Sequence, residues 1–133
     1  TACIGLTNLD IVDKSIAYRK QLYSKYRNAL SSLIESGKIR LQSFNEDSYN
    51  YSYFPVIFEN EEILLKVNEL LKTELIMARR YFYPSLNKLK WGHGQSCPVS
   101  EDISKRILCL PSHDRVNDED VKLICSKIYE IAK

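Results

Sequence analysis

Apolar side chains recur at helical spacing over the first quarter of the chain, and this pattern predicts one long helix over residues 6–33. The repeating positions are separated by three, four or seven residues: Leu9, Val12, Ile16, Tyr23, Tyr26 and Leu30. No glycine or proline interrupts the segment, and Gly37 follows as a stop signal. Helices of this length often connect two domains, so we expect the far end of this one to need a partner outside the chain.

Two segments after the long helix have the alternation and composition of strands. Residues 39–44 alternate apolar and polar side chains, and residues 51–58 are rich in aromatic and β-branched side chains. Residues 45–50 between them are typical of a turn. Pro55 cannot donate a hydrogen bond to a neighbouring strand, so we expect the second strand to lie at a sheet edge or to carry a bulge.

The second half of the chain predicts three more helices and another strand. The helices cover residues 60–75, 98–106 and 117–133, and a short buried strand covers 107–110. The first and last of these helices begin with an asparagine followed by acidic residues, which is a favourable helix start. Residues 77–97 follow no simple period and could contribute one further strand.

This order of elements predicts a single α+β domain over residues 1–133. A long linking helix (1–36) is followed by an α+β body (37–133), in which helices pack on one face of a small, largely antiparallel sheet. A chain of 133 residues with 44% hydrophobic residues is large enough for one core. The first residue is Thr, which is consistent with a piece of a longer protein.

Charge and cysteine content exclude several classes of protein. The net charge is +2 without a basic cluster, so we expect no nucleic-acid partner, and no apolar run is long enough to span a membrane. The four cysteines contain no Cys-x-x-Cys pair, so no metal site is predicted. Cys109 and Cys125 lie among apolar residues and are expected to be buried thiols in a reduced, cytoplasmic protein.

Residues 77–97 are the candidate ligand surface, because they concentrate arginine, tyrosine and the single tryptophan. Arg79 and Arg80 offer forked donors suited to carboxylates or phosphates, and Tyr81 and Tyr83 offer rings with a polar tip. In the alternative interpretation the aromatic rings fill gaps in the core and the arginines are solvated. His93 is isolated and expected to be exposed, and no arrangement of catalytic residues is recognisable.

Three segments resemble the sugar aminotransferases of the DegT/DnrJ/EryC1/StrS family. Residues 77–86, which read MARRYFYPSL, are similar to its Arg-x-Tyr-Phe-x-Pro segment, and residues 97–111, CPVSEDISKRILCLP, are similar to the Cys-Pro motif that follows. The start of the chain, with Gly5, Leu6, Leu9, Arg19 and Tyr26, resembles the long helix that leaves the large domain of those enzymes.

The resemblance implies the C-terminal small domain of a fold-type I aminotransferase. Such enzymes use pyridoxal phosphate to move an amino group, usually from glutamate, onto a keto-sugar linked to a nucleotide, and they form homodimers. The lysine motif that holds the cofactor lies in the large domain; Lys38 comes nearest here but lacks the context. The resemblance therefore implies no catalytic or cofactor-binding residue in this chain and an inactive fragment.

The resemblance also implies which residues line the sugar site: Arg80, Tyr81, Tyr83 and Asn87. Asn87 stands where many members have histidine, so it could bind a sugar hydroxyl or phosphate but could not shuttle protons. The Tyr-Phe-Tyr-Pro sequence is similar to members that aminate dideoxy-hexoses on a thymidine diphosphate carrier. If Tyr81 and Tyr83 lie on an extended segment they share a face, and Phe82 points into the core. The alternative function is a free-standing, non-catalytic binding module that uses the surface at residues 79–83.

Overall fold

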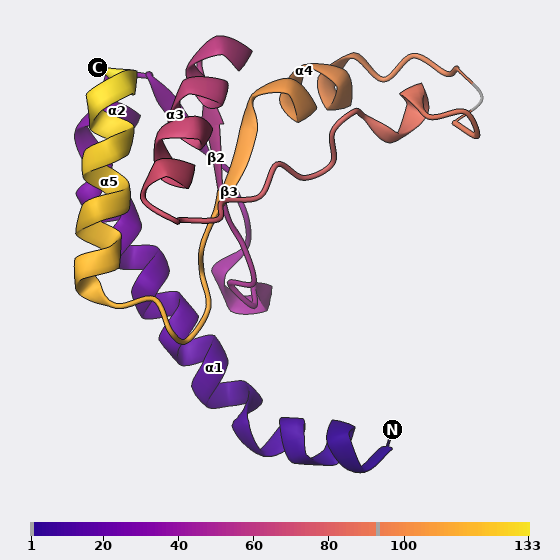
Figure 1. Cartoon of the computed structure of the whole chain (residues 1–133). Coiled ribbons are helices and arrows are strands. Elements are labelled where there is room, and N and C mark those ends of the chain that lie inside the picture. The colour runs from indigo at the N-terminus through magenta and orange to yellow at the C-terminus, as the bar shows by residue number, and fades with distance from the viewer. Residues whose placement is uncertain (1, 93) are drawn as a thin grey trace.

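The chain folds as a small antiparallel sheet flanked by helices, and the computed structural model describes residues 2–92 and 94–133 (Figure 1). The α+β class is confirmed. The elements in chain order are α1 (Ala2–Ala29), α2 (Ser31–Glu35), β1 (Ile39–Leu41), β2 (Phe54–Phe58), α3 (Glu61–Thr73), α4 (Pro98–Arg106), β3 (Ile107–Leu110) and α5 (Asp118–Ala132). Short 3₁₀ turns cover Glu46–Ser48 and Leu86–Lys88.

The strand that contains Pro55 lies at the centre of the sheet, so the prediction of an edge strand was wrong. The strand order is β1-β2-β3, with both pairs antiparallel. The ladder between β1 and β2 ends at the pair Leu41–Val56, one position before the proline. Pro55 is paired only with Cys109 of β3. The missing N–H therefore falls where β1 has already ended, and it explains why β1 has only three residues.

The core lies on one face of the sheet. Phe54, Val56 and Phe58 alternate along β2 and are at most 1% exposed, as strand periodicity requires. Three helices cover this face, and apolar positions complete the cluster: Tyr26 of α1 and Leu30 in the turn after it; Leu64, Val67 and Leu71 of α3; Val121, Ile124 and Ile128 of α5. The helix starts predicted at Asn60 and Asn117 are confirmed, because each side chain accepts a hydrogen bond from a backbone N–H of the first turn.

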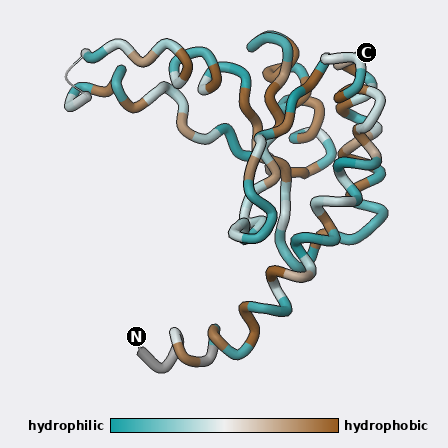
Figure 2. Tube along the Cα trace, turned by 180° about the vertical axis from the view of Figure 1, so that it is seen from behind, coloured by the Kyte–Doolittle hydropathy of each residue, from teal (hydrophilic) through white to brown (hydrophobic). Residues whose placement is uncertain are grey.

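The long helix is only partly embedded in this core. It ends at Ala29, a turn at Leu30 separates it from α2, and Gly37 then turns the chain into β1 with a φ of 75°. Tyr26 is fully buried, whereas Leu6 and Leu9 are 65% and 66% exposed. Figures 1 and 2 show this end of α1 leaving the body, with hydrophobic positions continuing along it. The far end therefore lacks a packing partner among the described residues.

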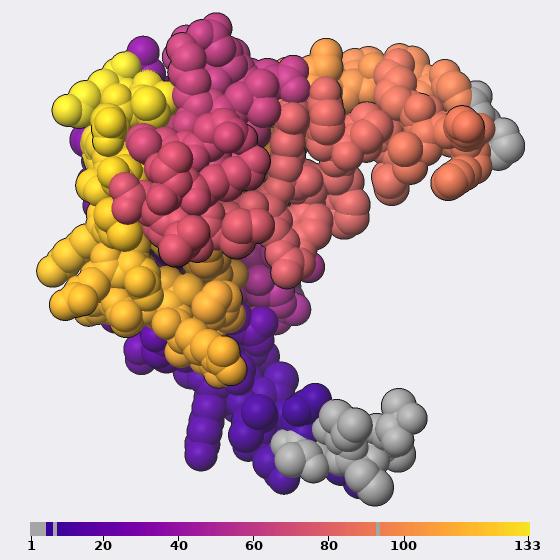
Figure 3. All heavy atoms as spheres, in the orientation of Figure 1, coloured from indigo at the N-terminus to yellow at the C-terminus, as the bar shows by residue number. Residues whose placement is uncertain are grey.

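A second projection leaves the body on the same side as the end of α1. We call residues 82–97 the arm; residue 93 lies outside the described residues. The arm runs out from the sheet and returns through α4, and a broad concave face separates it from the end of α1 (Figure 3). Gly92 is required within the arm, because a Cβ there would lie 2.5 Å from the carbonyl oxygen of Leu86.

Candidate functional site

Arg79 extends the sheet by a single residue. Its N–H donates to the carbonyl of Cys109 at 2.9 Å, and the N–H of Cys109 donates to the carbonyl of Arg79 at 2.8 Å. This isolated pair lies on the side of β3 away from β2. Residues directly opposite each other in a ladder place their side chains on the same face. Arg79, Cys109 and Pro55 therefore share the face of the sheet opposite the core.

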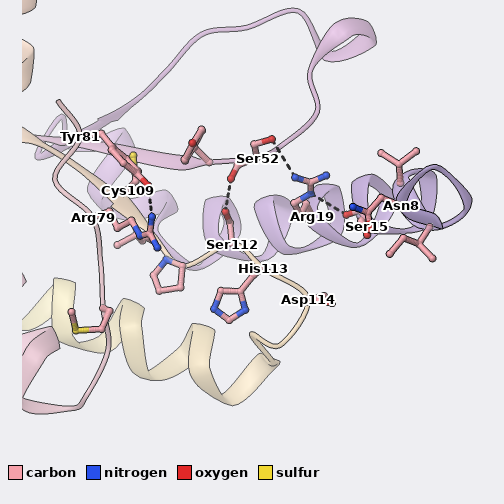
Figure 4. Close-up of a pocket in the computed structure, with 16 residues that line it drawn as sticks. Asn8, Ser15, Arg19, Ser52, Arg79, Tyr81, Cys109, Ser112, His113 and Asp114 are labelled. Carbon is pink, nitrogen blue, oxygen red and sulfur yellow. Dashed lines mark hydrogen bonds between the residues drawn. The ribbon is translucent and has the colours of Figure 1, made fainter. Parts of the chain in front are cut away.

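A pocket of about 700 Å³ opens over this face (Figure 4). The pocket joins four segments that are far apart in the sequence. The lining residues are Asn8, Ile11, Val12, Ser15 and Arg19 of α1; Ser52 and Tyr53; Met77, Arg79 and Tyr81; and Cys109 to Asp114. Of the residues predicted from the sequence to bind the sugar, Tyr81 alone is in this lining.

Both pocket arginines are held by neutral oxygens. Arg19 donates through Nε to the carbonyl of Ser15 and through Nη1 to the hydroxyl of Ser52, each at 3.2 Å. The hydroxyl of Ser112 donates to the carbonyl of Ser52 at 3.0 Å and fixes that loop. Arg79 donates through Nη1 to the hydroxyl of Tyr81 at 2.7 Å, and this bond raises the pKa of Arg79.

Arg80 lies on the other side of the segment and joins three elements. Its guanidinium forms an ion pair with Glu61 at the start of α3 and donates to the carbonyl of Lys105 in α4 at 2.8 Å. It also stacks over the ring of Tyr83, 3.5 Å from the ring centre. The bond from Arg80 is the main cause that lowers the pKa of Glu61. These contacts fix the root of the arm to the body.

The two tyrosines of the predicted site do not share a face. The chain turns at residues 81–82, so the alternation of an extended segment stops there. Tyr81 contacts Arg79 and lies edge-on to Tyr53, whereas Tyr83 lies under Arg80. The expectation that Phe82 enters the core was also wrong, because this side chain is 69% exposed. Tyr83 thus contacts Arg80, whereas Tyr81 lines the pocket.

Asn87 is the centre of a hydrogen-bond network that closes the arm. Its amide donates to the carbonyl of Gln95 at 2.6 Å and to the carboxylate of Glu101 at 2.7 Å, and its oxygen accepts from Ser85. The backbone N–H of Cys97 also donates to Glu101, at 3.0 Å, and Lys88 pairs with the same carboxylate. These bonds lower the pKa of Glu101 to about 2, with the Cys97 bond the largest cause. The donors of Asn87 are therefore used on Gln95 of the arm and on Glu101 of α4.

The lysines of this chain do not fit a covalent cofactor site. Pyridoxal phosphate needs a lysine held in a dry, shaped pocket. Every lysine here is exposed or half-buried, and none lines the pocket between α1 and the sheet. Lys38, the nearest match in sequence, pairs with Glu59 at 3.7 Å.

Two of the cysteines are buried thiols. Cys109 and Cys125 are buried as predicted, and burial raises their pKa values to about 11 and about 12. Residues 2–92 and 94–133 hold no group of three His, Cys, Asp or Glu residues that could bind a metal ion. Over the same residues no helix is long and apolar enough to cross a membrane. His93, expected to be exposed, lies outside the described residues.

The sequence does not predict Ser52 and Arg19 as residues of a binding site. Ser52 is part of a predicted strand, and Arg19 is named only as a position of the long-helix resemblance, not as a ligand-binding residue. The strand is absent at that point because Tyr51 adopts a left-handed conformation, with a φ of 54°, and β2 begins only at Phe54. Arg19 and Ser52 meet only because the helix and the loop pack together in the fold. The spacing of residues along the sequence therefore does not predict this contact.

The chain is similar in sequence and fold to sugar aminotransferases. The chain is 32% identical to a dTDP-4-amino-4,6-dideoxy-D-glucose transaminase of Escherichia coli, over 96% of the chain and 37% of that protein. The crystal structure of DesI with its TDP-sugar product superimposes with a TM-score of 0.82 at 26% identity, over 96% of the chain and 34% of DesI. The structure of NtdA from Bacillus subtilis with bound cofactor PMP shares the fold, with a TM-score of 0.79 at 22% identity, over 98% of the chain and 31% of NtdA.

The profile of the DegT/DnrJ/EryC1/StrS aminotransferase family matches residues 1–129. The chain belongs to this family, and the resemblance in its motifs is confirmed. It spans about a third of the length of these relatives.

Proposed function

We propose that this chain is the C-terminal small domain of a pyridoxal-phosphate-dependent nucleotide-sugar aminotransferase. The observation that carries the proposal is the family match over residues 1–129, combined with coverage of only about a third of the relatives. The parent enzyme transfers an amino group from glutamate to a keto-sugar nucleotide, acts in the cytoplasm and forms a homodimer. The cofactor supplies the electron sink for this transfer when it is bound.

In this proposal the segment from Arg80 to Asn87 forms one wall of the sugar site. Tyr83 offers a ring that is 49% exposed, and Tyr81 reaches the pocket between α1 and the sheet. Arg80 orients Tyr83 through its stack, and Asn87 holds the arm closed. The lysines do not fit a covalent cofactor site, which supports an inactive domain on its own.

The experiment uses the full-length protein and the sugar named for the Escherichia coli relative. The protein is incubated with dTDP-4-amino-4,6-dideoxy-D-glucose and 2-oxoglutarate. Transfer of the amino group yields glutamate and the 4-keto sugar, one for one, and glutamate is quantified by mass spectrometry. We expect turnover by the full-length protein and none by the 133-residue chain.

Two outcomes would contradict the proposal. Turnover by the 133-residue chain alone would show that it holds the catalytic site. Absence of turnover by the full-length protein, with this sugar and with a panel of other amino-sugar nucleotides, would favour the non-catalytic binding module that uses residues 79–83.

A further inference from the structure

We propose that the pocket between α1 and the outer face of the sheet is a binding site for an organic ligand that carries a phosphate or carboxylate group. Arg19 and Arg79 are its anchors. The proposal concerns residues of this chain alone and does not depend on aminotransferase activity.

The guanidinium groups of Arg19 and Arg79 are not paired with a carboxylate in the described part of the chain. Arg80 and Arg106, in contrast, are paired with Glu61 and Asp102. A guanidinium has five N–H donors, and each pocket arginine uses one or two of them, on neutral oxygens. The guanidinium groups of Arg19 and Arg79 are therefore held in place by neutral oxygens, and no carboxylate of the described residues neutralises their charge.

The lining of the pocket combines positive charge with hydroxyl groups. Arg19 and Arg79 supply two positive charges against one negative charge from Asp114, which forms no ion pair with either of them in the described part of the chain. Hydroxyl groups add further donors, from Ser15, Ser52 and the two tyrosines Tyr53 and Tyr81, whereas the Ser112 hydroxyl already donates to the carbonyl of Ser52. Forked guanidinium donors beside hydroxyls match the oxygens of a phosphate or carboxylate.

The pocket is large enough for an organic molecule, and part of its wall is apolar. A volume of about 700 Å³ lies within the range of small-molecule sites and is far larger than a single ion requires. Ile11 and Val12 of α1 and Leu110 and Pro111 after β3 form apolar parts of the lining. Figure 4 shows Arg19 and Arg79 on opposite sides of Ser52 and Ser112. The pocket thus suits a molecule with an anionic group and a less polar body.

The test is an NMR titration of the isotopically labelled chain at constant ionic strength and neutral pH. Separate titrations use inorganic phosphate, diphosphate and glutarate, and sodium chloride serves as the salt control. We expect saturable shifts of the backbone amides of Ser52, Tyr81 and Ser112 with at least one oxyanion and none with chloride. Saturation by phosphate or diphosphate alone assigns a phosphate-bearing ligand, and saturation by glutarate alone assigns a carboxylate.

Three variants locate the site. Arg19→Gln and Arg79→Gln should each weaken binding about tenfold or more, because a charge-assisted hydrogen bond is lost. Arg27→Gln is the matched control, since Arg27 is an exposed arginine of the same helix outside the pocket, and it should leave binding unchanged.

Two results would overturn the proposal: no saturable shift at the pocket with any oxyanion, or an equal loss of affinity in all three variants. The first result is measured on the wild-type chain alone, so it tests the proposal even if a variant does not fold. A negative titration would leave the aminotransferase assignment intact, because amino transfer is measured separately.

Discussion

Arg79 and Arg80 are adjacent in the sequence yet have opposite environments. The bridge of Arg79 to Cys109 fixes the backbone direction, and alternation then places the next side chain on the other face. Arg79 enters the pocket, whereas Arg80 meets Glu61, Tyr83 and the carbonyl of Lys105. The sequence alone supports either arginine as a ligand anchor, and the structure shows that they differ in how fully their charge is compensated.

The first prediction tests Arg80 in the sugar site of the full-length protein. Arg80→Ala should weaken binding of the sugar nucleotide about 10- to 100-fold, because it removes the stack that orients Tyr83 and the Arg80 donors that Glu61 and Lys105 do not use. Loss of one charge-assisted hydrogen bond costs about 1.5–3 kcal/mol. Calorimetric titration measures the affinity, and the absorbance of the bound cofactor should not change.

Glu61→Gln is the control for this prediction. It removes the charge that Arg80 meets in the body but keeps the arginine, its bond to Lys105 and its stack on Tyr83. We expect affinity within about threefold of wild type, as for a group outside the ligand contacts. Equal losses in both variants would show that Arg80 only fixes the arm, and normal binding by Arg80→Ala would exclude it from the site.

The second prediction concerns Glu101, whose folded-state pKa of about 2 lies below the ordinary value of about 4.3. A carboxylate with a depressed pKa contributes stability above its unfolded pKa, and this contribution is lost as the pH falls through the folded pKa. The arm should therefore loosen as the pH drops from about 4.3 towards about 2. The single tryptophan, Trp91, lies in the arm, so its fluorescence anisotropy should fall over this window.

Two variants separate the arm from the rest of the protein. Glu101→Gln should show low anisotropy already at neutral pH and no step on acidification. Glu62→Gln removes an exposed carboxylate of α3 that bonds Lys66, far along the chain from the arm, and should keep the wild-type profile. Identical profiles for wild type and Glu101→Gln would refute the closing role of the Asn87–Glu101 network.

At the scale of elements, α1 is one helix with two different surroundings. Its second half carries Tyr26 and leads to Leu30, both fully buried, whereas Leu9 in its first half is 66% exposed. Apolar side chains recur at the same spacing in both halves. The pattern therefore predicts the helix, but it does not predict where the body of the protein stops packing against it. The exposed half is ready to pack against another part of a larger assembly.

The third prediction compares the projecting half of α1 with Leu30, the buried residue directly after α1, in the 133-residue chain. Leu30→Ala should lower the free energy of unfolding by about 2–5 kcal/mol, because a buried side chain leaves a cavity. Leu9→Ala should change it by less than about 0.5 kcal/mol, since the side chain is already in water. Urea denaturation measures both. A large loss for Leu9→Ala would mean that the projecting half is covered in solution.

The elements that the sequence predicts well are those fixed by local patterns. The helix at Asn60 follows from its cap and periodic face, and the strand at 107–110 follows from its apolar run; both lie where predicted. The errors arise where a partner decides the outcome. Pro55 is tolerated in the central strand because β1 stops beside it, and Phe82 is exposed because the chain turns at 81–82. For the candidate site, the sequence predicts the segment at residues 77–97. It does not predict that Arg79 and Tyr81 line the pocket whereas Arg80, Tyr83 and Asn87 fix the arm.

At the scale of the whole molecule, two projections extend from one compact body and enclose a concave face (Figure 3). The pocket with Arg19 and Arg79 is built partly from the projecting helix, since Asn8, Ile11 and Val12 line it. The arm carries Phe82 and Trp91 on its surface, each 69% exposed. A shape with this much exposed apolar surface is typical of a domain that packs against other protein.

The last prediction tests whether the domain alone can hold pyridoxal phosphate. The chain is incubated with the cofactor, reduced with borohydride and mapped by mass spectrometry. Because every lysine is exposed or half-buried and none lines the pocket, each should react weakly and none should dominate. We expect scattered, substoichiometric phosphopyridoxyl adducts, while the full-length protein gives one adduct per chain at a lysine outside these residues. A stoichiometric adduct at one lysine of this chain, lost on its replacement by arginine as in Lys38→Arg, would place the cofactor in this domain and refute its assignment as the small domain.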